Sequence, residues 1–170
     1  MKNKFTILGS GSSLGAPWIT NYMGKLKKNS KNIRTRCCAH IKYGNLSILI
    51  DTSPDIKSQF LKNKINSLDA IVYTHEHADQ TSGIFEMRPF FWKNKKKIPV
   101  YGSKRTIKAL ISKYTFCFKP RHGYKPIMAT NIIKNKFEVK VNNKKFKITA
   151  FNVIHGMIKA NGFLFNKIAY

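Results

Sequence analysis

Thr74-His75-Glu76-His77-Ala78-Asp79-Gln80 follows directly on the apolar run 70–73. The run predicts a short strand, and side chains two residues apart in an extended segment point to the same side. His75 and His77 can therefore converge on one metal ion, whereas the same spacing on a helix would turn them apart. Asp79 adds an oxygen ligand that suits a second cation; imidazole suits zinc and iron, and carboxylate oxygen also accepts manganese. This stretch predicts a metal site where the strand ends.

The competing interpretation of the same stretch is a polar surface loop. The chain contains five histidines, and two of them occur in the HxHxD pattern directly after an apolar strand. A solvated loop would not explain why two of the five histidines occur in this pattern, so we favour the metal site. His155 also follows a predicted strand and precedes a glycine. From its position alone, a structural role and a ligand role explain His155 equally well.

Outward from this stretch, the chain carries short apolar runs bounded by turn residues, a pattern typical of strands. Tyr43-Gly44-Asn45 and Asn142-Asn143 predict the turns of two β-hairpins. The expected strands are residues 5–8, 37–42, 46–51, 70–73, 98–101, 137–141, 146–153, 162–165 and 167–170.

Two helices are expected between these strands. Ser53-Pro54 predicts the N-cap and the first residue of one helix, and Ser103 predicts the N-cap of the other. Strands interleaved with helices predict a layered α/β or α+β domain. The side chains expected on the buried helix faces are Ile56, Phe60 and Leu61 in the first helix, and Ile107, Leu110, Ile111 and Tyr114 in the second.

The composition predicts one globular domain, residues 1–170. Apolar residues make up 42% of the 170 positions, and neither an internal repeat nor a linker divides them. No segment approaches the roughly 20 apolar residues of a membrane span, and the N-terminus lacks a signal-peptide core. The three cysteines do not form a disulfide framework. We therefore expect a cytoplasmic protein that does not associate with membranes.

The net charge is strongly positive. Thirty-two Lys and Arg residues against seven Asp and Glu residues give +25, and such a field attracts phosphates, RNA and other anions. Most of the basic residues are lysines among many Asn and Ile residues, a combination that codon bias in an AT-rich genome also produces. The charge alone therefore leaves open whether a nucleic-acid surface exists.

The metal motif followed by Gly83-Ile84 resembles the HxHxDH signature of the metallo-β-lactamase superfamily. Residues 49–55, with Asp51, are similar to the Asp-containing strand that precedes the signature there. Within the superfamily, the chain resembles the branch that contains the phosphonate-pathway cyclic phosphodiesterase. The residues that carry this closer resemblance are Gly9-Ser10-Gly11-Ser12-Ser13-Leu14-Gly15, Arg34-Thr35-Arg36, Gly83-Ile84-x-x-x-Arg88, Gly123-Tyr124 and His155-Gly156.

The resemblance implies an α/β fold, the metallo-β-lactamase αββα sandwich, with its first half and the start of its second half present. It also implies a hydrolase with two divalent metal ions, zinc or manganese, bridged by a hydroxide that attacks the substrate. His75, His77 and His155 would hold one metal. Asp79 would hold the other metal and take part in catalysis.

The substrate that the resemblance implies is a small anionic compound with a phosphodiester or cyclic phosphate. Arg34, Arg36 and Arg88 are candidates to bind its phosphate, because the planar guanidinium fork matches phosphate oxygens. Each of these arginines, taken alone, is equally well explained as a solvated surface residue.

Two features depart from the superfamily pattern. Gln80 occupies the position of the final histidine. Its carbonyl oxygen would be a weaker, neutral ligand, so the second metal site is expected to be weak, selective for a harder cation, or empty. Relatives supply a metal-bridging aspartate and a further histidine after the strand that corresponds to 167–170. We therefore expect a chain that is incomplete at its C-terminus.

Two other functions compete with the phosphodiesterase-like hydrolase. A tRNA-processing nuclease of the same superfamily would suit the +25 charge, although residues 83–88 resemble the phosphodiesterase branch more closely. A non-catalytic basic domain that binds nucleic acid would explain both the charge and Gln80. The sequence predicts neither the oligomeric state nor the identity of the substrate.

Overall fold

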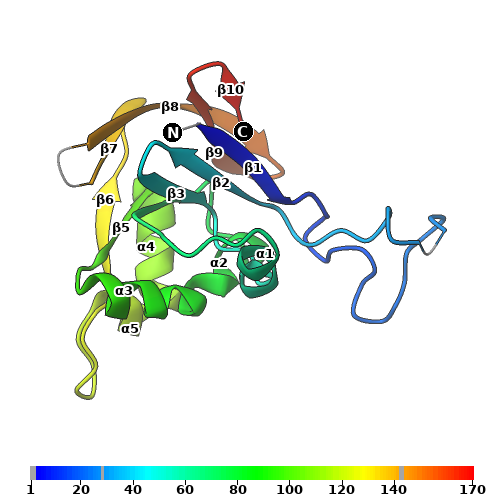
Figure 1. Cartoon of the computed structure of the whole chain (residues 1–170), viewed down its shortest axis with the longest axis horizontal. Helices are drawn as coiled ribbons and strands as arrows, with labels where there is room; N and C mark the ends of the chain where they lie inside the picture. The colour runs from blue at the N-terminus through cyan, green and yellow to red at the C-terminus, as the bar shows by residue number, and fades with distance from the viewer. Residues whose placement is uncertain (1–2, 28, 142–143) are drawn as a thin grey trace.

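The computed structural model describes residues 3–27, 29–141 and 144–170, which form two β-sheets and a layer of helices (Figure 1). The first sheet has the strand order β1-β2-β3-β4-β5-β6. The first three strands pair antiparallel, and β3 to β6 pair parallel. These strands are β1 (Lys4–Gly9), β2 (Cys38–Tyr43), β3 (Leu46–Ile50), β4 (Ala70–Val72), β5 (Ile98–Gly102) and β6 (Met128–Ile132).

The second sheet is antiparallel and has the order β10-β9-β8-β7. Its strands are β7 (Lys136–Val141), β8 (Lys144–His155), β9 (Ile158–Phe165) and β10 (Ile168–Ala169). The two sheets pack face to face, with Ile48 and Ile50 of β3 in the same buried cluster as Phe146 and Ile148 of β8. This cluster forms the interior of the expected sandwich.

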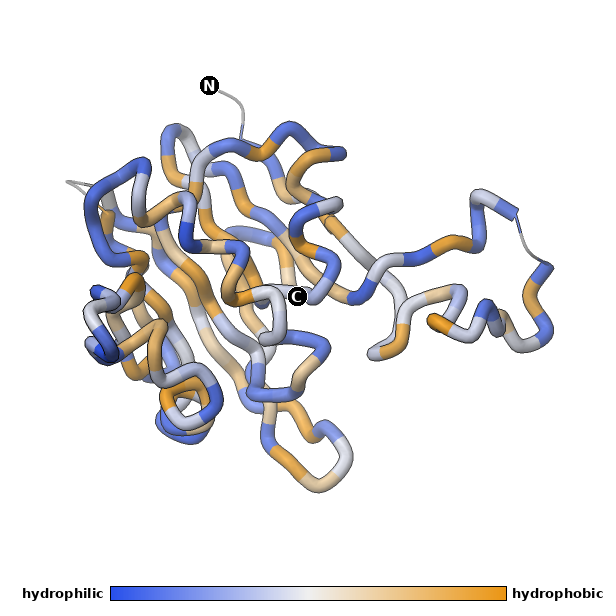
Figure 2. Tube along the Cα trace, turned by 90° about the horizontal axis from the view of Figure 1, so that it is seen from below, coloured by the Kyte–Doolittle hydropathy of each residue, from blue (hydrophilic) through white to orange (hydrophobic). Residues whose placement is uncertain are grey.

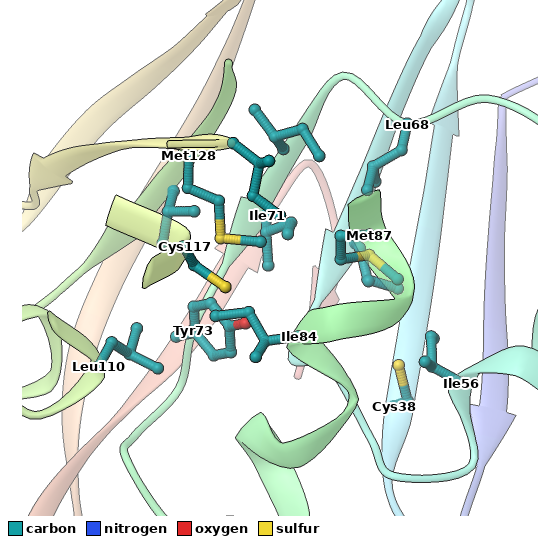
Figure 3. Close-up of a cluster of buried hydrophobic side chains, with 14 of the residues drawn as sticks. Cys38, Ile56, Leu68, Ile71, Tyr73, Ile84, Met87, Leu110, Cys117 and Met128 are labelled. Atoms are coloured by element: carbon teal, nitrogen blue, oxygen red, sulfur yellow. The ribbon is translucent and has the colours of Figure 1, made fainter. Parts of the chain in front are cut away.

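Helices cover the other face of the first sheet (Figure 1). Figure 3 shows the cluster between these two layers, which includes Ile56, Met87 and Leu110 from the helical side and Ile71 of β4. All five residues of β3 and all three of β4 are buried, as is typical of central parallel strands covered on both faces. The helices are α1 (Ile56–Lys62), α2 (Ala78–Thr81), η1 (Ser82–Met87), α3 (Arg88–Asn94), α4 (Lys104–Lys113) and α5 (Thr115–Phe118).

The layer order of helices, sheet and sheet confirms the predicted fold class: the first half of the αββα sandwich and the start of the second half are present. Within the described ranges, no helix combines the length and the apolar character needed to cross a membrane.

Several local predictions were wrong. The first helix begins at Ile56, and its N-cap is Asp55; the Ser53 hydroxyl instead accepts a hydrogen bond from the Asp55 N–H at 3.1 Å. Leu61 is 72% exposed, because it lies one position past Phe60 and therefore about 100° around the helix. Tyr114, expected within the second helix, is the C-cap of α4, although its partly buried side chain packs against the core as predicted.

The sequence analysis also missed some helices and strands or misplaced where they begin. Strand β9 begins at Ile158, four residues before the expected start, and β6 and α3 were not anticipated. The N-cap at Ser103 is confirmed, because its hydroxyl accepts a hydrogen bond from the Thr106 N–H at 3.1 Å. The predicted turn at Asn142-Asn143 lies outside the described residues.

The segment between β1 and β2 projects away from the two sheets (Figures 1 and 2). In this arm the Trp18 and Tyr22 rings pack on each other, with centroids 4.9 Å apart. The arm returns to the body at Arg36, whose backbone pairs with Gly11. Trp18 therefore lies on a part of the chain that is separate from the helical layer.

His40 in β2 is a buried structural histidine, and its Nε2 lies 2.8 Å from the Ser47 hydroxyl. Burial, with smaller effects from Lys42 and Lys4, lowers the pKa of His40 to about 4. An unfolded histidine has a pKa of about 6.5. As the pH falls from about 6.5 to about 4, the unfolded chain gains a proton that the folded chain does not, so stability decreases.

We expect His40 to contribute an acid-dependent loss of stability on the order of 3 kcal/mol across that range. The measurement is the free energy of unfolding in urea at about pH 7 and about pH 4.5, for the wild type and His40→Gln. Glutamine can keep the hydrogen bond to Ser47 but does not titrate. An equal decrease in both proteins would contradict the prediction.

Candidate metal centre

Three histidines from the two sheets meet at one end of the sandwich. His75 and His77 follow β4, and His77 is the N-cap of α2. His155 is the last residue of β8. One ligand nitrogen from each lies within 4.8 Å of the others, and the ring centroids are 4.6 to 5.2 Å apart. The structure thus brings together all three histidines that the sequence analysis selected.

Hydrogen bonds between the sheets account for the position of His155. Asn161 of β9 donates its backbone N–H to the Thr74 carbonyl at 2.9 Å, and its side-chain amide donates to the same oxygen at 3.4 Å. Strand β8 turns into β9 through Gly156, which has φ +58°, and His155 pairs with Ile158. The second sheet is therefore attached to the residue directly before His75. This attachment places His155 opposite the other two rings.

A chain of hydrogen bonds orients the His75 ring. Asp51 accepts the Thr74 N–H and the Thr74 hydroxyl, each at 2.8 Å. The Thr74 oxygen lies 2.9 Å from Nδ1 of His75. Because the hydroxyl hydrogen goes to Asp51, the Thr74 oxygen accepts the Nδ1–H of His75. Nε2 of His75 then carries a lone pair that is available to a metal ion. Partners of this kind fix the tautomer of metal-binding histidines.

His75 is only 8% exposed. Burial, assisted by His77 and His155, lowers the pKa of His75 to about 4, so the ring is neutral near pH 7. Neutral imidazole is the form that binds metal. In the described structure its Nε2 is buried without a hydrogen-bond partner, which costs about 1–3 kcal/mol in a protein interior. A divalent metal ion would satisfy this atom, so the residues present fit such an ion.

Asp51 holds an unusual backbone conformation at the end of β3, with φ +62°. Burial raises the pKa of its carboxyl to about 7, although both hydrogen bonds from Thr74 oppose the increase. The sequence analysis noted Asp51 for its resemblance to relatives and did not give it a role. Its position as the anchor of Thr74 depends on strand pairing between β3 and β4, which no local pattern reveals.

Asp79 and Gln80 lie on the first turns after the histidines. The Gln80 amide donates to the Asp79 carboxylate at 3.0 Å, and the Gln80 side-chain oxygen is buried without a partner among the described residues. Asp79 is half-buried and does not join the three-histidine group within the described ranges. The roles of Asp79 as a ligand and catalytic group, and of Gln80 as a weak ligand, therefore stay predictions.

Glu76 points away from the two histidines that flank it and ties the motif to α4. Its carboxylate accepts hydrogen bonds from Arg105 at 2.7 Å and from the Thr106 hydroxyl at 3.3 Å. Its carbonyl oxygen accepts a hydrogen bond from Lys113 at 2.8 Å. The sequence analysis missed this role. The available signal was the alternation of side chains in an extended segment, which sends residue 76 to the side opposite 75 and 77.

The three candidate arginines have separate surroundings. Arg36 forms a two-pronged ion pair with Asp55, with contacts of 2.6 and 2.9 Å, and this pair holds the pKa of Asp55 below its usual value. Arg34 lies in the arm and donates to the Lys31 and Ile33 carbonyls. Arg88 stacks on the rings of Trp92 and Tyr124. Whether any of the three binds phosphate stays a prediction.

The sequence-family model that describes the beta-lactamase superfamily domain matches residues 47–170, a range that contains the three-histidine cluster. The chain belongs to the beta-lactamase superfamily. The same range contains Asp51, Thr74 and Asn161, so the hydrogen bonds that orient the cluster also lie within the matched domain.

The solved structures that resemble the chain include a diphosphatase of the PhnP family. It superposes with a TM-score of 0.85 and 28% sequence identity over 100% of this chain and 64% of its own. Zinc-bound PqqB from Methylobacterium extorquens gives a TM-score of 0.69 at 14% identity, over 99% of this chain and 61% of its own. Human tRNase Z, short form, gives 0.63 at 17% identity, over 95% of this chain and 64% of its own. The last two likenesses show the metallo-β-lactamase fold.

Among curated proteins, an octanoyltransferase of Porphyromonas gingivalis (strain ATCC BAA-308 / W83) is 25% identical over 167 residues. The alignment covers 96% of this chain and 33% of that protein. The chain therefore spans a third of that relative and 64% of the diphosphatase.

Proposed function

We propose that the chain belongs to a metal-dependent hydrolase that cleaves a phosphodiester or cyclic phosphate. The observation that carries the proposal is the buried Nε2 of His75, which has no hydrogen-bond partner in the described structure, on a ring that is grouped with His77 and His155. Likeness to a PhnP-family diphosphatase at 28% identity supports phosphate chemistry. The +25 charge supports an anionic substrate.

In this proposal, His75, His77 and His155 hold one divalent metal ion, zinc or manganese, and Asp79 with Gln80 contributes to a second site. A bound divalent metal supplies an activated water and offsets charge on the phosphoryl oxygens. Asp51 and Thr74 keep Nε2 of His75 unprotonated, and Glu76 holds the loop against α4. The half-buried Asp79 carboxylate, next to the cluster in sequence, is also the proposed catalytic residue.

The test is hydrolysis of bis(p-nitrophenyl) phosphate by the chain after treatment with a chelator and after addition of zinc or manganese. We expect turnover to appear with metal and to disappear with chelator, because the histidines alone provide no activated water at neutral pH. Equal turnover of the metal-free and metal-loaded chain would contradict the proposal.

A nuclease of the tRNA-processing type is the second candidate, and the +25 charge favours it. The two candidates differ in substrate. A nuclease would cleave a structured RNA at a defined position and leave a small cyclic phosphate intact, whereas the first candidate would do the reverse.

A further inference from the structure

A hollow of about 1170 Å³ lies on the helical side of the molecule. Its walls come from η1, α3, α5 and the segment 121–127. The hollow is slightly larger than common small-molecule sites, which are about 300–1,000 Å³, so it has room for a ligand of that class. Five aromatic rings line it: Phe85, Phe91, Trp92, Phe116 and Tyr124. Four permanent cations line it as well, namely Arg88, Lys95, Arg121 and Lys125, and among the described lining residues there is no acidic side chain.

Arg88 is the central cation of this hollow. Its guanidinium carbon lies 4.6 Å from the centroid of Trp92 and 5.3 Å from that of Tyr124. The described residues give the Arg88 guanidinium neither an ion pair nor a hydrogen bond, in contrast to the guanidinium groups of Arg36 and Arg105. Its faces therefore lie against rings while its N–H groups stay free. Those groups are the ones that bind phosphate in a two-pronged geometry.

The rings are more exposed than a structural role requires. Trp92 is 51% exposed and Tyr124 is 59% exposed. Phe85 and Phe116 stack nearly parallel, with centroids 4.7 Å apart and an interplanar angle of 7°. Exposed aromatic rings gathered in one hollow mark a binding site more often than an inert surface. Flat exposed rings beside arginine are the surface on which nucleobases stack.

A tight hairpin presents Tyr124 to Arg88. Arg121 and Tyr124 pair through their backbones, and the two residues between them, His122 and Gly123, have φ +46° and +79°. Two positive φ angles are those of a two-residue hairpin turn, which holds its flanking side chains firmly. The Tyr124 wall of the hollow is thus preformed.

From these observations we propose that the hollow is a nucleotide-binding site, which takes a nucleobase against its rings and the attached phosphate at Arg88. Lys95, Arg121 and Lys125 supply further positive charge around the phosphate. An acidic peptide would meet the cations but would not use the rings, and an apolar partner would leave four cations without counter-charges. The proposal does not rest on metal binding or hydrolysis.

Fluorescence of Trp92 reports on this site directly. The chain contains two tryptophans, so Trp18→Phe in the projecting arm leaves Trp92 as the single reporter. The metal-free Trp18→Phe protein, kept in chelator, is titrated with AMP, adenosine, ribose 5-phosphate, hexa-adenylate and a glutamate hexapeptide. We expect AMP to quench Trp92 and to bind about 10-fold or more tightly than adenosine or ribose 5-phosphate, because it uses both halves of the site.

Matched variants locate the binding. Arg88→Gln and Tyr124→Ala, both at exposed positions, should each weaken AMP binding by about 10-fold or more, whereas Lys147→Gln on β8 should not change it.

Tighter binding of hexa-adenylate than of AMP, with the same dependence on Arg88, would identify a polynucleotide as the source; equal binding would identify a free nucleotide. Unchanged AMP affinity in folded Arg88→Gln, or glutamate-peptide binding equal to that of AMP, would overturn the proposal. Failure here leaves the hydrolysis test unaffected, because no turnover is measured.

Discussion

Replacing His75 with alanine is expected to abolish metal-dependent phosphodiester hydrolysis and to weaken metal binding by more than roughly 100-fold. Even the loss of a hydrogen-bond partner of a metal ligand costs about 10–100-fold in affinity, and His75 is proposed as a ligand itself. It is also the most buried of the three histidines, with a neutral ring and an unpartnered Nε2 in the described structure. The measurements are kcat/KM with a chromogenic phosphodiester and a zinc titration against a competing chelator.

The matched control is His40→Gln, which removes a histidine outside the cluster. His40 of β2 forms a hydrogen bond with Ser47 of β3 and does not belong to the three-histidine group. The His40→Gln protein should therefore keep the metal affinity and turnover of the wild type near neutral pH. A folded His75→Ala protein that keeps wild-type metal affinity would contradict the proposed centre, whatever its turnover.

Asp51→Asn is expected to lower metal affinity by about 10–100-fold while the chain stays folded. The asparagine oxygen can still accept the Thr74 N–H, but its amide nitrogen then faces the Thr74 hydroxyl and must donate to it. The Thr74 hydroxyl would in turn donate to Nδ1 of His75 and leave the hydrogen on Nε2. An imidazole protonated at Nε2 offers no lone pair to the metal. The change at residue 51 would thus switch His75 to the tautomer that does not bind metal.

Thr74→Val separates this tautomer effect from packing, because it removes the relay without forcing either tautomer on His75. We expect its metal affinity to lie between those of the wild type and Asp51→Asn. The measurement is the same zinc titration, together with thermal unfolding of each metal-free protein. Asp51→Asn with wild-type affinity, or an affinity loss that merely follows a loss of folded protein, would contradict the relay.

The fold class was predictable because a few segments carry strong local patterns. The apolar run of β3 and the run before His75 are buried on both faces, and such segments specify central strands without help from the rest of the chain. Strand β6 was missed because only Met128 of its five residues is buried, so the apolar pattern of a strand is absent there. Leu61 was misplaced because the seven-residue helix α1 buries a face too narrow for both Phe60 and Leu61.

The site was predictable only in part. The spacing of His75 and His77 shows their common direction, whereas the approach of His155 depends on the bonds from Asn161 to Thr74, which are 87 residues apart in sequence. Arg36 and Arg88 looked alike as phosphate ligands, yet one is paired with Asp55 and the other is held between two rings. Partners such as Asp55 and Tyr124 come from tertiary packing, and the residue type alone does not reveal them.

Anomalous X-ray diffraction from crystals of the chain grown with zinc tests the central claim most directly. The account predicts an anomalous peak among His75, His77 and His155, with a nitrogen of each about 2.1 Å from the ion. A second, weaker peak beside Asp79 and Gln80 would mark the second site. Zinc bound elsewhere on the chain, with the three histidines free of metal, would contradict the account.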